Sequence, residues 1–288
     1  MENSESKHRV NPLTSLMRQP KIYVKLPSKG NFWPTGSLDL SPNGEYAVYS
    51  MTARDELMLK TPDALMNGQA VVDVIQNCVP AIKDAWQIPS IDLDVILIAL
   101  RLATYGETMD TTIKLAGEDF TYNVDLRKLL DSLYETVTWD ERINIGKDVA
   151  LYIKPINYKI ISQSSIQNFE TQKLMNLVND SALTEEQKIA TFRESFKKLT
   201  DITVGIINNS VFRIESSTGS TDEPNDIAEF MDNCDKFVFD AVKERLEQLR
   251  ERNSLKPVQV QATPEMIAAG SDEFIEIPLI FDPSNFFG

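Results

Sequence analysis

The chain has 288 residues, 42% of them hydrophobic, so it can bury one large core or two modest ones. The only histidine, His8, lies in a polar N-terminal segment, which excludes Ser-His-Asp and Cys-His catalysis and histidine-rich metal sites. The formal charge of -14 is uneven, because residues 1–30 carry six basic residues against two acidic ones, whereas the rest carries 23 against 41. The acidic body should repel nucleic acid, which leaves only the N-terminal arm to bind it, through Lys7, Arg9, Arg18, Lys21, Lys25 and Lys29.

Neither export nor membrane insertion is predicted. The first thirty residues lack the apolar run of a signal peptide, and no later segment reaches about 18 uncharged apolar residues. Cys78 and Cys234 fall on what read as the inner faces of two helices, so we expect unlinked thiols in a reducing compartment. The expected location is therefore the cytoplasm.

Residues 1–20 are polar and contain two prolines, so they should stay loose until a partner orders them. Residues 21–26 alternate as a strand does, and the prolines and glycines from Pro27 to Gly44 then predict an irregular stretch. Phe32 and Trp33 lie in this stretch, and we expect them to pack onto the following domain rather than to bind a ligand.

From Tyr46 the signals turn helical, with a capping box formed by Thr52 and Asp55. A helix is predicted over 62–78, with Thr61 as its N-cap and Leu65, Val72, Ile75 and Val79 on its inner face. Ser90 should cap the next helix, which ends at Gly106. That helix is apolar nearly all round and is therefore expected at the centre of a core.

Residues 111–115 and 120–124 predict a β-hairpin, and a helix follows over 126–137. Residues 148–161 again have strand character, which Pro155 interrupts. We expect a second, helical region over 163–252. Thr184 and Gln187 form its first capping box, and an apolar stripe follows at Ile189, Phe192, Phe196, Leu199, Ile202 and Ile206.

The last predicted helix opens with acids and closes with basic residues, as the helix dipole favours. Its inward face is expected to carry Ile227, Phe230, Cys234, Phe237, Ala241 and Leu249. Residues 216–224 should form a flexible loop before it. The predicted fold class is α+β, mainly α: a flexible basic arm (1–20), an α+β domain with a β-hairpin (21–162), a helical hairpin or bundle (163–252) and an extended aromatic tail (253–288).

The aromatic C-terminal tail is the most unusual feature. It is either a last strand folded onto its own core or a linear motif that binds a partner. In the second case the partner-binding residues are Phe281, Asp282, Pro283, Phe286 and Phe287.

The remaining motifs offer little chemistry. Lys29-Gly30 has the wrong order for a phosphate loop, and Gly146-Lys147 lacks the leading glycine and the Ser or Thr of that motif. Carboxylate pairs such as Asp92 with Asp94, or Asp131 with Glu135, are inevitable among 43 acids, and we interpret them as capping or solvated groups. We therefore predict no catalytic residue, cofactor or metal site.

Several short segments, taken together in their order, resemble a known family. They are Lys25-Leu26-Pro27-Ser28-Lys29-Gly30, Asp55-Glu56-Leu57, residues 61–68, residues 101–106 and residues 122–126. This pattern resembles the T4-type bacteriophage base plate protein family, with a looser echo at residues 281–287. The resemblance implies a non-enzymatic baseplate hub assembly protein of a contractile-tailed phage. Such a protein would bind hub and tail proteins in the infected bacterial cytoplasm, and the resemblance leaves open whether it stays in the virion or leaves as a chaperone.

Two alternatives stay open. One is an enzyme whose site uses only carboxylates, lysines and backbone groups. The other is a nucleic-acid accessory protein that uses the basic N-terminal arm.

Truncation after Ile280 separates the two readings of the tail. We expect an almost unchanged melting temperature and lost capture of baseplate proteins from infected-cell lysate. A structural strand would instead lower the stability by several kcal/mol, since each buried Phe contributes roughly 1.5–3 kcal/mol. Unchanged melting together with unchanged capture would leave the motif without a role.

Overall fold

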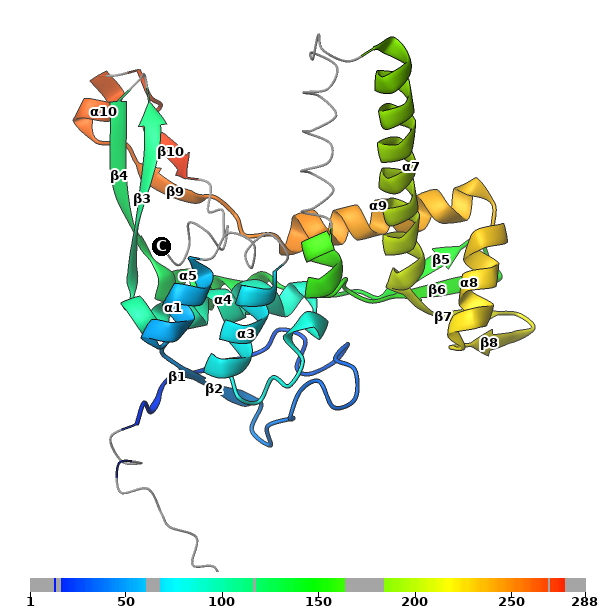
Figure 1. Ribbon diagram of the computed structural model, residues 1–288, viewed down its shortest axis with the longest axis horizontal. Helices are drawn as coiled ribbons and strands as arrows, with labels where there is room; N and C mark the ends of the chain where they lie inside the picture. Colours follow the sequence, from blue (N-terminus) through cyan, green and yellow to red (C-terminus); the bar gives the residue numbers. More distant parts are fainter. Residues whose placement is uncertain are drawn as a thin grey trace, which may run out of the picture.

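The computed structural model describes residues 13, 17–60, 68–115, 118–163, 184–268 and 270–277. Its helices and small antiparallel sheets form an α+β fold in which helix predominates, as the sequence predicted (Figure 1). Two separate hydrophobic cores organise these elements.

Helix α4 (Ser90–Tyr105) is the centre of the first core. Ten of its apolar residues are buried, so apolar neighbours surround it nearly all round, which confirms the prediction. The helix ends at Gly106, whose φ of 97° suits a residue without a Cβ. Ser90 is not its cap, because it is already the first helical residue and the N-cap position belongs to Pro89, which has no side-chain donor or acceptor. The other elements of this unit are β1 (Pro20–Lys25), β2 (Glu45–Tyr49), α1 (Ala53–Leu59), α3 (Gln69–Cys78), η2 (Ala85–Gln87), β3 (Thr108–Leu115), β4 (Glu118–Asp125) and α5 (Leu126–Thr136).

Strand β2 was not predicted, because helix was expected from Tyr46. It pairs antiparallel with β1, and Tyr46 and Val48 are buried while Glu45, Ala47 and Tyr49 are only partly buried. This alternation is the period of a strand with one face on a core. Helical signals begin only at Thr52, where the predicted capping box with Asp55 is present and opens α1.

Helix α3 starts later than predicted. Gly68 precedes it with a φ of 75°, a left-handed conformation that interrupts any helix running through it. A Cβ at Gly68 would lie 2.7 Å from Ser162 Oγ, so glycine is also required by packing. The end of the helix at Cys78 and the burial of Val72, Ile75 and Val79 are confirmed, whereas Thr61 and Leu65 lie outside the described residues.

The described end of the N-terminal arm is fixed by Arg18, where a loose arm was expected. Its guanidinium donates to Ser50 O at 2.6 Å, to Asn77 O at 2.6 Å and to Asn77 Oδ1 at 2.8 Å. It also lies 3.8 Å from the Asp55 carboxylate and over the ring of Tyr49. Arg18 therefore links β2, α1 and α3, and this basic residue is already engaged within its own chain.

The predicted hairpin and the helix after it are confirmed, and the hairpin is longer than expected. β3 and β4 pair over all eight residues of each strand, and α5 starts directly after β4 with the Asp125 side chain as its N-cap. The strand expected over 148–161 ends at Ile153 instead, and residues 158–163 are helical. Tyr158 belongs to this helical turn and stacks on Trp86. Pro155 separates the two conformations because it has no N–H with which to continue a strand.

The second core lies between helices and a four-stranded sheet with the order β5-β6-β7-β8. Its buried apolar side chains include Leu151 and Ile153 of β6, Ile214 of β7, and Val242 and Leu249 of α9. The elements are β5 (Arg142–Ile145), β6 (Val149–Ile153), α7 (Glu185–Ser210), β7 (Val211–Ser216), β8 (Gly219–Thr221), α8 (Pro224–Asn233) and α9 (Lys236–Asn253).

Residues 211–253 differ from the prediction in three ways. β7 and β8 form a hairpin where helix and a flexible loop were expected. The single last helix is two helices, because the chain is extended at Cys234 and Asp235. Phe237 was expected to face inward but is 68% exposed, since this break shifts the faces of α9 relative to α8. Ile227 and Leu249 are buried as predicted, and Cys234 is half-buried.

After α9 the chain returns to the first unit (Figure 1). Leu255 and Val258 pack against the first core, and β9 (Val258–Gln261) pairs antiparallel with β10 (Phe274–Ile277) around α10 (Pro264–Ala268). Ile277 is fully buried. The beginning of the tail is thus a strand paired with its own chain, and residues 278–288 lie outside the described residues.

Both cysteines are unlinked, as predicted, and Cys78 should react slowly with thiol reagents in the native protein. Burial raises its pKa to about 11, so little thiolate exists near neutral pH. We expect Cys234, which is only half-buried, to be labelled first. Arg18→Ala should slow labelling of Cys78 further, because the guanidinium lies 3.6 Å from its sulfur and lowers the pKa of the thiol. Mass spectrometry of timed native labelling measures both rates, and equal rates for the two thiols would contradict the prediction.

Candidate functional site

A buried carboxylate fixes the segment that forms one wall of the candidate site. Asp92 Oδ1, on α4, accepts a hydrogen bond from Ser28 N at 2.8 Å, and Oδ2 accepts from Ser28 Oγ and from Trp33 Nε1, the latter at 2.8 Å. Burial raises the pKa of Asp92 to about 6, against the hydrogen bonds, which favour the charged form. The loop after β1 is therefore held against the first core at two points.

Between these two points the backbone adopts an uncommon conformation. Lys29, Gly30 and Phe32 have φ values of 55°, 84° and 67°. Gly30 also needs the space, because a Cβ there would lie 2.5 Å from Leu40 Cδ2. Left-handed backbone at two non-glycine residues is costly and persists only where the surroundings impose it. Here it places the Phe32 ring edge-on against Trp139, with 6.3 Å between the ring centroids.

The opposite wall is the connection from α5 to β5, residues 137–141. Trp139 Nε1 donates to Ile153 O at 2.9 Å, and Asp140 Oδ2 accepts from Arg245 Nη2 at 2.5 Å. The backbone is bonded as well, because Thr138 N donates to Asn253 Oδ1 and Ile153 N donates to Glu141 O. This wall is thus tied to β6 and α9, which belong to the second unit.

The two walls enclose a hollow of about 530 Å³, which we call the Phe32–Trp139 hollow. Phe32, Ile91, Val137 and Trp139 contribute apolar side chains to its lining, but polar groups, with the charges of Lys29, Asp140 and Glu141, make up more than half of the lining. A hollow with a mixed lining of this kind can take an apolar side chain of a protein partner together with polar contacts at its rim. Both walls are already hydrogen-bonded to the body of the protein, so such a partner would meet a preformed surface.

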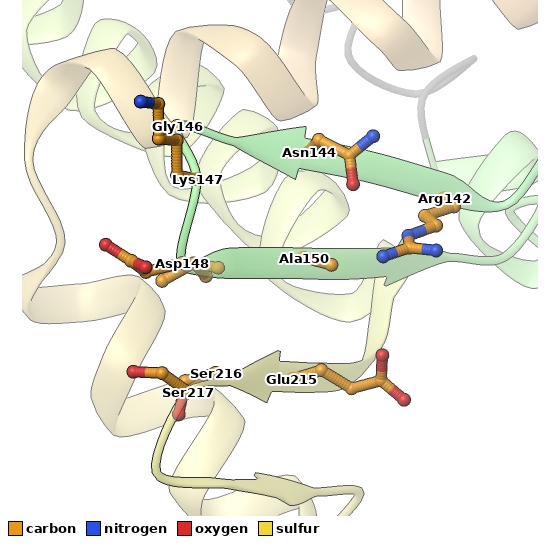
Figure 2. Close-up of a pocket in the computed structure, with 10 residues that line it drawn as sticks. Arg142, Asn144, Gly146, Lys147, Asp148, Ala150, Glu215, Ser216 and Ser217 are labelled. Carbon is orange, nitrogen blue, oxygen red and sulfur yellow. The ribbon is translucent and has the colours of Figure 1, made fainter.

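A second, shallower basin of about 260 Å³ lies on the open face of the four-stranded sheet (Figure 2). Arg142 and Glu215 stand at one end of it, and Lys147, Asp148 and Ser217 stand at the other. Glu215 is engaged by Tyr152 Oη at 2.7 Å and by Arg213 Nη2 at 2.6 Å. Gly146 and Lys147 form the turn between β5 and β6 rather than the start of a helix, so this turn lacks the helix N-terminus of a phosphate loop.

The partner-binding residues predicted from the sequence lie outside the described residues, namely Phe281, Asp282, Pro283, Phe286 and Phe287. Lys7 and Arg9 of the basic arm also lie outside the described residues. Arg18 is hydrogen-bonded to Ser50 and Asn77, and Lys25 Nζ lies 3.8 Å from Glu45 Oε1. Among the described residues, no helix is both long and apolar enough to cross a membrane, and no three His, Cys, Asp or Glu residues gather as metal ligands.

The carboxylate pairs were interpreted from the sequence as capping or solvated groups, which is wrong for Asp92, because that side chain is fully buried. Asp92 is bonded to Ser28 and Trp33, and Asp131 and Glu135 are exposed on α5. Trp33 packs on the first core, as expected, whereas Phe32 meets Trp139. Trp139 was not predicted to be a site residue. A lone tryptophan between a predicted helix and a predicted strand was the available signal, because large aromatic residues in connections usually pack against something.

Comparison with known proteins identifies one family. The family described as T4 bacteriophage base plate protein matches residues 19–259, which is most of the chain. No curated protein and no solved structure matches. The matched range includes both walls of the Phe32–Trp139 hollow and helix α7.

Asp92 and Asp94 provide matched substitutions on one helix. Asp92→Ala should lower the free energy of unfolding by about 3 kcal/mol or more, because three buried donors lose their acceptor. Within the described part of the chain the Asp94 carboxyl makes no hydrogen bond, and burial alone raises its pKa to about 6. Asp94→Asn should therefore stabilise the protein near neutral pH, since it removes a poorly solvated charge.

The raised pKa values of Asp92 and Asp94 determine how the free energy of unfolding depends on pH. Both folded pKa values lie above the unfolded value of about 3.9, so the folded state binds more protons between about pH 4 and pH 6. The stability that this gives at low pH is lost as the pH rises through about 6. The advantage of Asp94→Asn should accordingly vanish near pH 4, where Asp94 is neutral. Urea unfolding of the wild type and of Asp94→Asn near pH 4 and near pH 7 tests this. If Asp94→Asn is less stable than the wild type near pH 7, the prediction is wrong.

Proposed function

Because the chain belongs to the T4 bacteriophage base plate protein family, we propose that it is a non-enzymatic hub assembly protein that binds other tail proteins while the baseplate hub is built. The family match identifies a phage baseplate protein, and we propose in addition that it acts in assembly of the hub. The observation that carries the binding role is the preformed Phe32–Trp139 hollow.

Preorganisation favours the hollow as a binding surface. A partner that inserts a side chain there does not have to order either wall, because Asp92 holds Ser28 and Trp33 while Ile153 and Arg245 hold the other side. Avoiding the cost of ordering a loop leaves more of the contact energy as affinity. The left-handed residues Lys29 and Phe32 are further support, since backbone strain of this kind is concentrated at functional sites.

The net charge supports a role in binding other proteins during assembly. The chain carries a formal charge of -14, which speeds encounter with basic partner surfaces and disfavours wrong contacts with acidic ones. A chaperone-like factor needs this kind of selectivity while subunits are still unassembled. The family also indicates association with the phage tail, and retention in the finished particle distinguishes a hub component from a released assembly factor.

Affinity capture of the tagged full chain from infected cells tests the proposal. We expect phage tail or baseplate proteins to co-purify, and Phe32→Ser to reduce their recovery with little change in melting temperature. Phe237→Ser is the matched control, because Phe237 is exposed on α9 and does not line the hollow. Capture with no tail protein enriched would reject the proposed function, whereas equal recovery by both variants would reject only the hollow.

Two further measurements complete this test. Mass spectrometry of purified virions, compared with assembly intermediates, decides between a retained component and a released factor. A thermal-shift screen with nucleotides and divalent metals addresses the enzyme alternative, since a bound ligand raises the melting temperature. We expect no shift, and a reproducible one would favour the alternative.

A further inference from the structure

The Phe32–Trp139 hollow carries two charges that its own chain leaves unmatched. Among the described residues that line it, Lys29, Asp140 and Glu141 are the charged ones. Asp140 already forms an ion pair with Arg245 of α9, at 2.5 Å. Within the described part of the chain, the Lys29 ammonium and the Glu141 carboxylate form neither an ion pair nor a side-chain hydrogen bond. These two charges are therefore available to a partner.

The two unmatched charges have opposite signs and lie on opposite walls. Lys29 is exposed in the loop after β1, and its backbone N donates to Leu26 O at 2.9 Å. Glu141 is half-buried at the end of the other wall, where its backbone oxygen accepts from Ile153 N at 2.7 Å. The backbone of each residue is thus held in place. A half-buried carboxylate without a donor is poorly solvated, so a cation from a partner would stabilise it.

Other charges nearby do not change this pattern. Asp92 lies behind the first wall and accepts hydrogen bonds from Ser28 and Trp33. Arg142 follows Glu141 in the chain, but it lies over the open face of the four-stranded sheet (Figure 2). The net charge of -14 acts on the approach of a whole partner, whereas contact at the hollow depends on the charges that line it. The hollow therefore favours a partner segment with one charge of each sign.

We propose that the Phe32–Trp139 hollow binds a segment of a tail protein in which an apolar side chain lies between a basic and an acidic residue. The basic residue faces Glu141, the acidic residue faces Lys29, and the apolar side chain packs between them. An apolar centre with polar contacts at the rim is the usual anatomy of a protein interface. A segment with two like charges would oppose one wall, which disfavours it. This inference rests on the proposed function, because it defines the partner chemistry of the same hollow.

Three synthetic peptides of equal length, each with one central Phe, are the probes for this rule. The mixed peptide has Lys on one side of the Phe and Glu on the other, the basic peptide has Lys on both sides, and the acidic peptide has Glu on both. In fluorescence anisotropy with the full chain, the mixed peptide should bind at least about threefold more tightly than the other two, as expected for partly exposed ion pairs. Phe32→Ser should weaken the mixed peptide about tenfold, while Phe237→Ser should not.

Reversing one wall at a time should switch the preference. Lys29→Glu places acids on both walls, so this variant should prefer the basic peptide, and Glu141→Lys should prefer the acidic one. Lys147→Glu is the matched control for the first reversal, because Lys147 is also an exposed lysine beside a glycine but does not line the hollow. It should keep the preference for the mixed peptide. The melting temperature of each variant checks that its fold is intact.

The outcomes separate this inference from the proposed function. Equal binding of the three peptides, no binding by the wild type, or an unchanged preference in both reversed variants would each overturn the inference. Dimerisation of the wild type that Phe32→Ser abolishes would also overturn it, because a second copy would then fill the hollow. If tail proteins are still captured from infected cells in any of these cases, the proposed function stands and only the charge rule fails.

Discussion

The hydrogen bonds from Ser28 and Trp33 to the buried Asp92 carboxylate are the constraint on which the candidate site depends. A carboxylate at the centre of a core must be satisfied by donors, and here the donors come from a loop about sixty residues earlier in the chain. The central helix thereby fixes a segment that has no regular structure of its own. The left-handed residues Lys29 and Phe32 lie between the two attachment points, where the chain has to turn sharply.

At the junction between the two units, a second irregular segment is also fixed by hydrogen bonds. This segment is the connection from α5 to β5, which is only a few residues long. Trp139 and Glu141 are hydrogen-bonded to Ile153 of β6, and Asp140 forms an ion pair with Arg245 of α9. Because the first wall packs on the first core and Trp139 of the second wall packs on the second core, the Phe32–Trp139 hollow exists only while the two units keep this arrangement. A partner bound there would in turn hold the units together.

The family indicates interaction with other phage tail or baseplate proteins, and the chain presents surfaces of different character. The hollow is preformed and lined in part by aromatic side chains, whereas the N-terminal half of α7 exposes the apolar side chains of Ile189, Phe192 and Phe196. Such contrast gives each surface its own class of partner, because charge complementarity discriminates between partners even where apolar contacts are alike.

The sequence by itself determined the elements whose signals are local: α4 with its apolar surface, the hairpin before α5, and the capping box of Thr52 with Asp55. Only the tertiary structure decided what depends on distant segments. β2 and β7 are strands because partners lie beside them, Phe237 is exposed because the chain breaks before α9, and Asp92 is bonded while Asp94 is not. Propensities and caps act within a few residues of the chain, whereas strand pairing, burial and hydrogen bonding of a carboxylate are settled by residues that folding brings together.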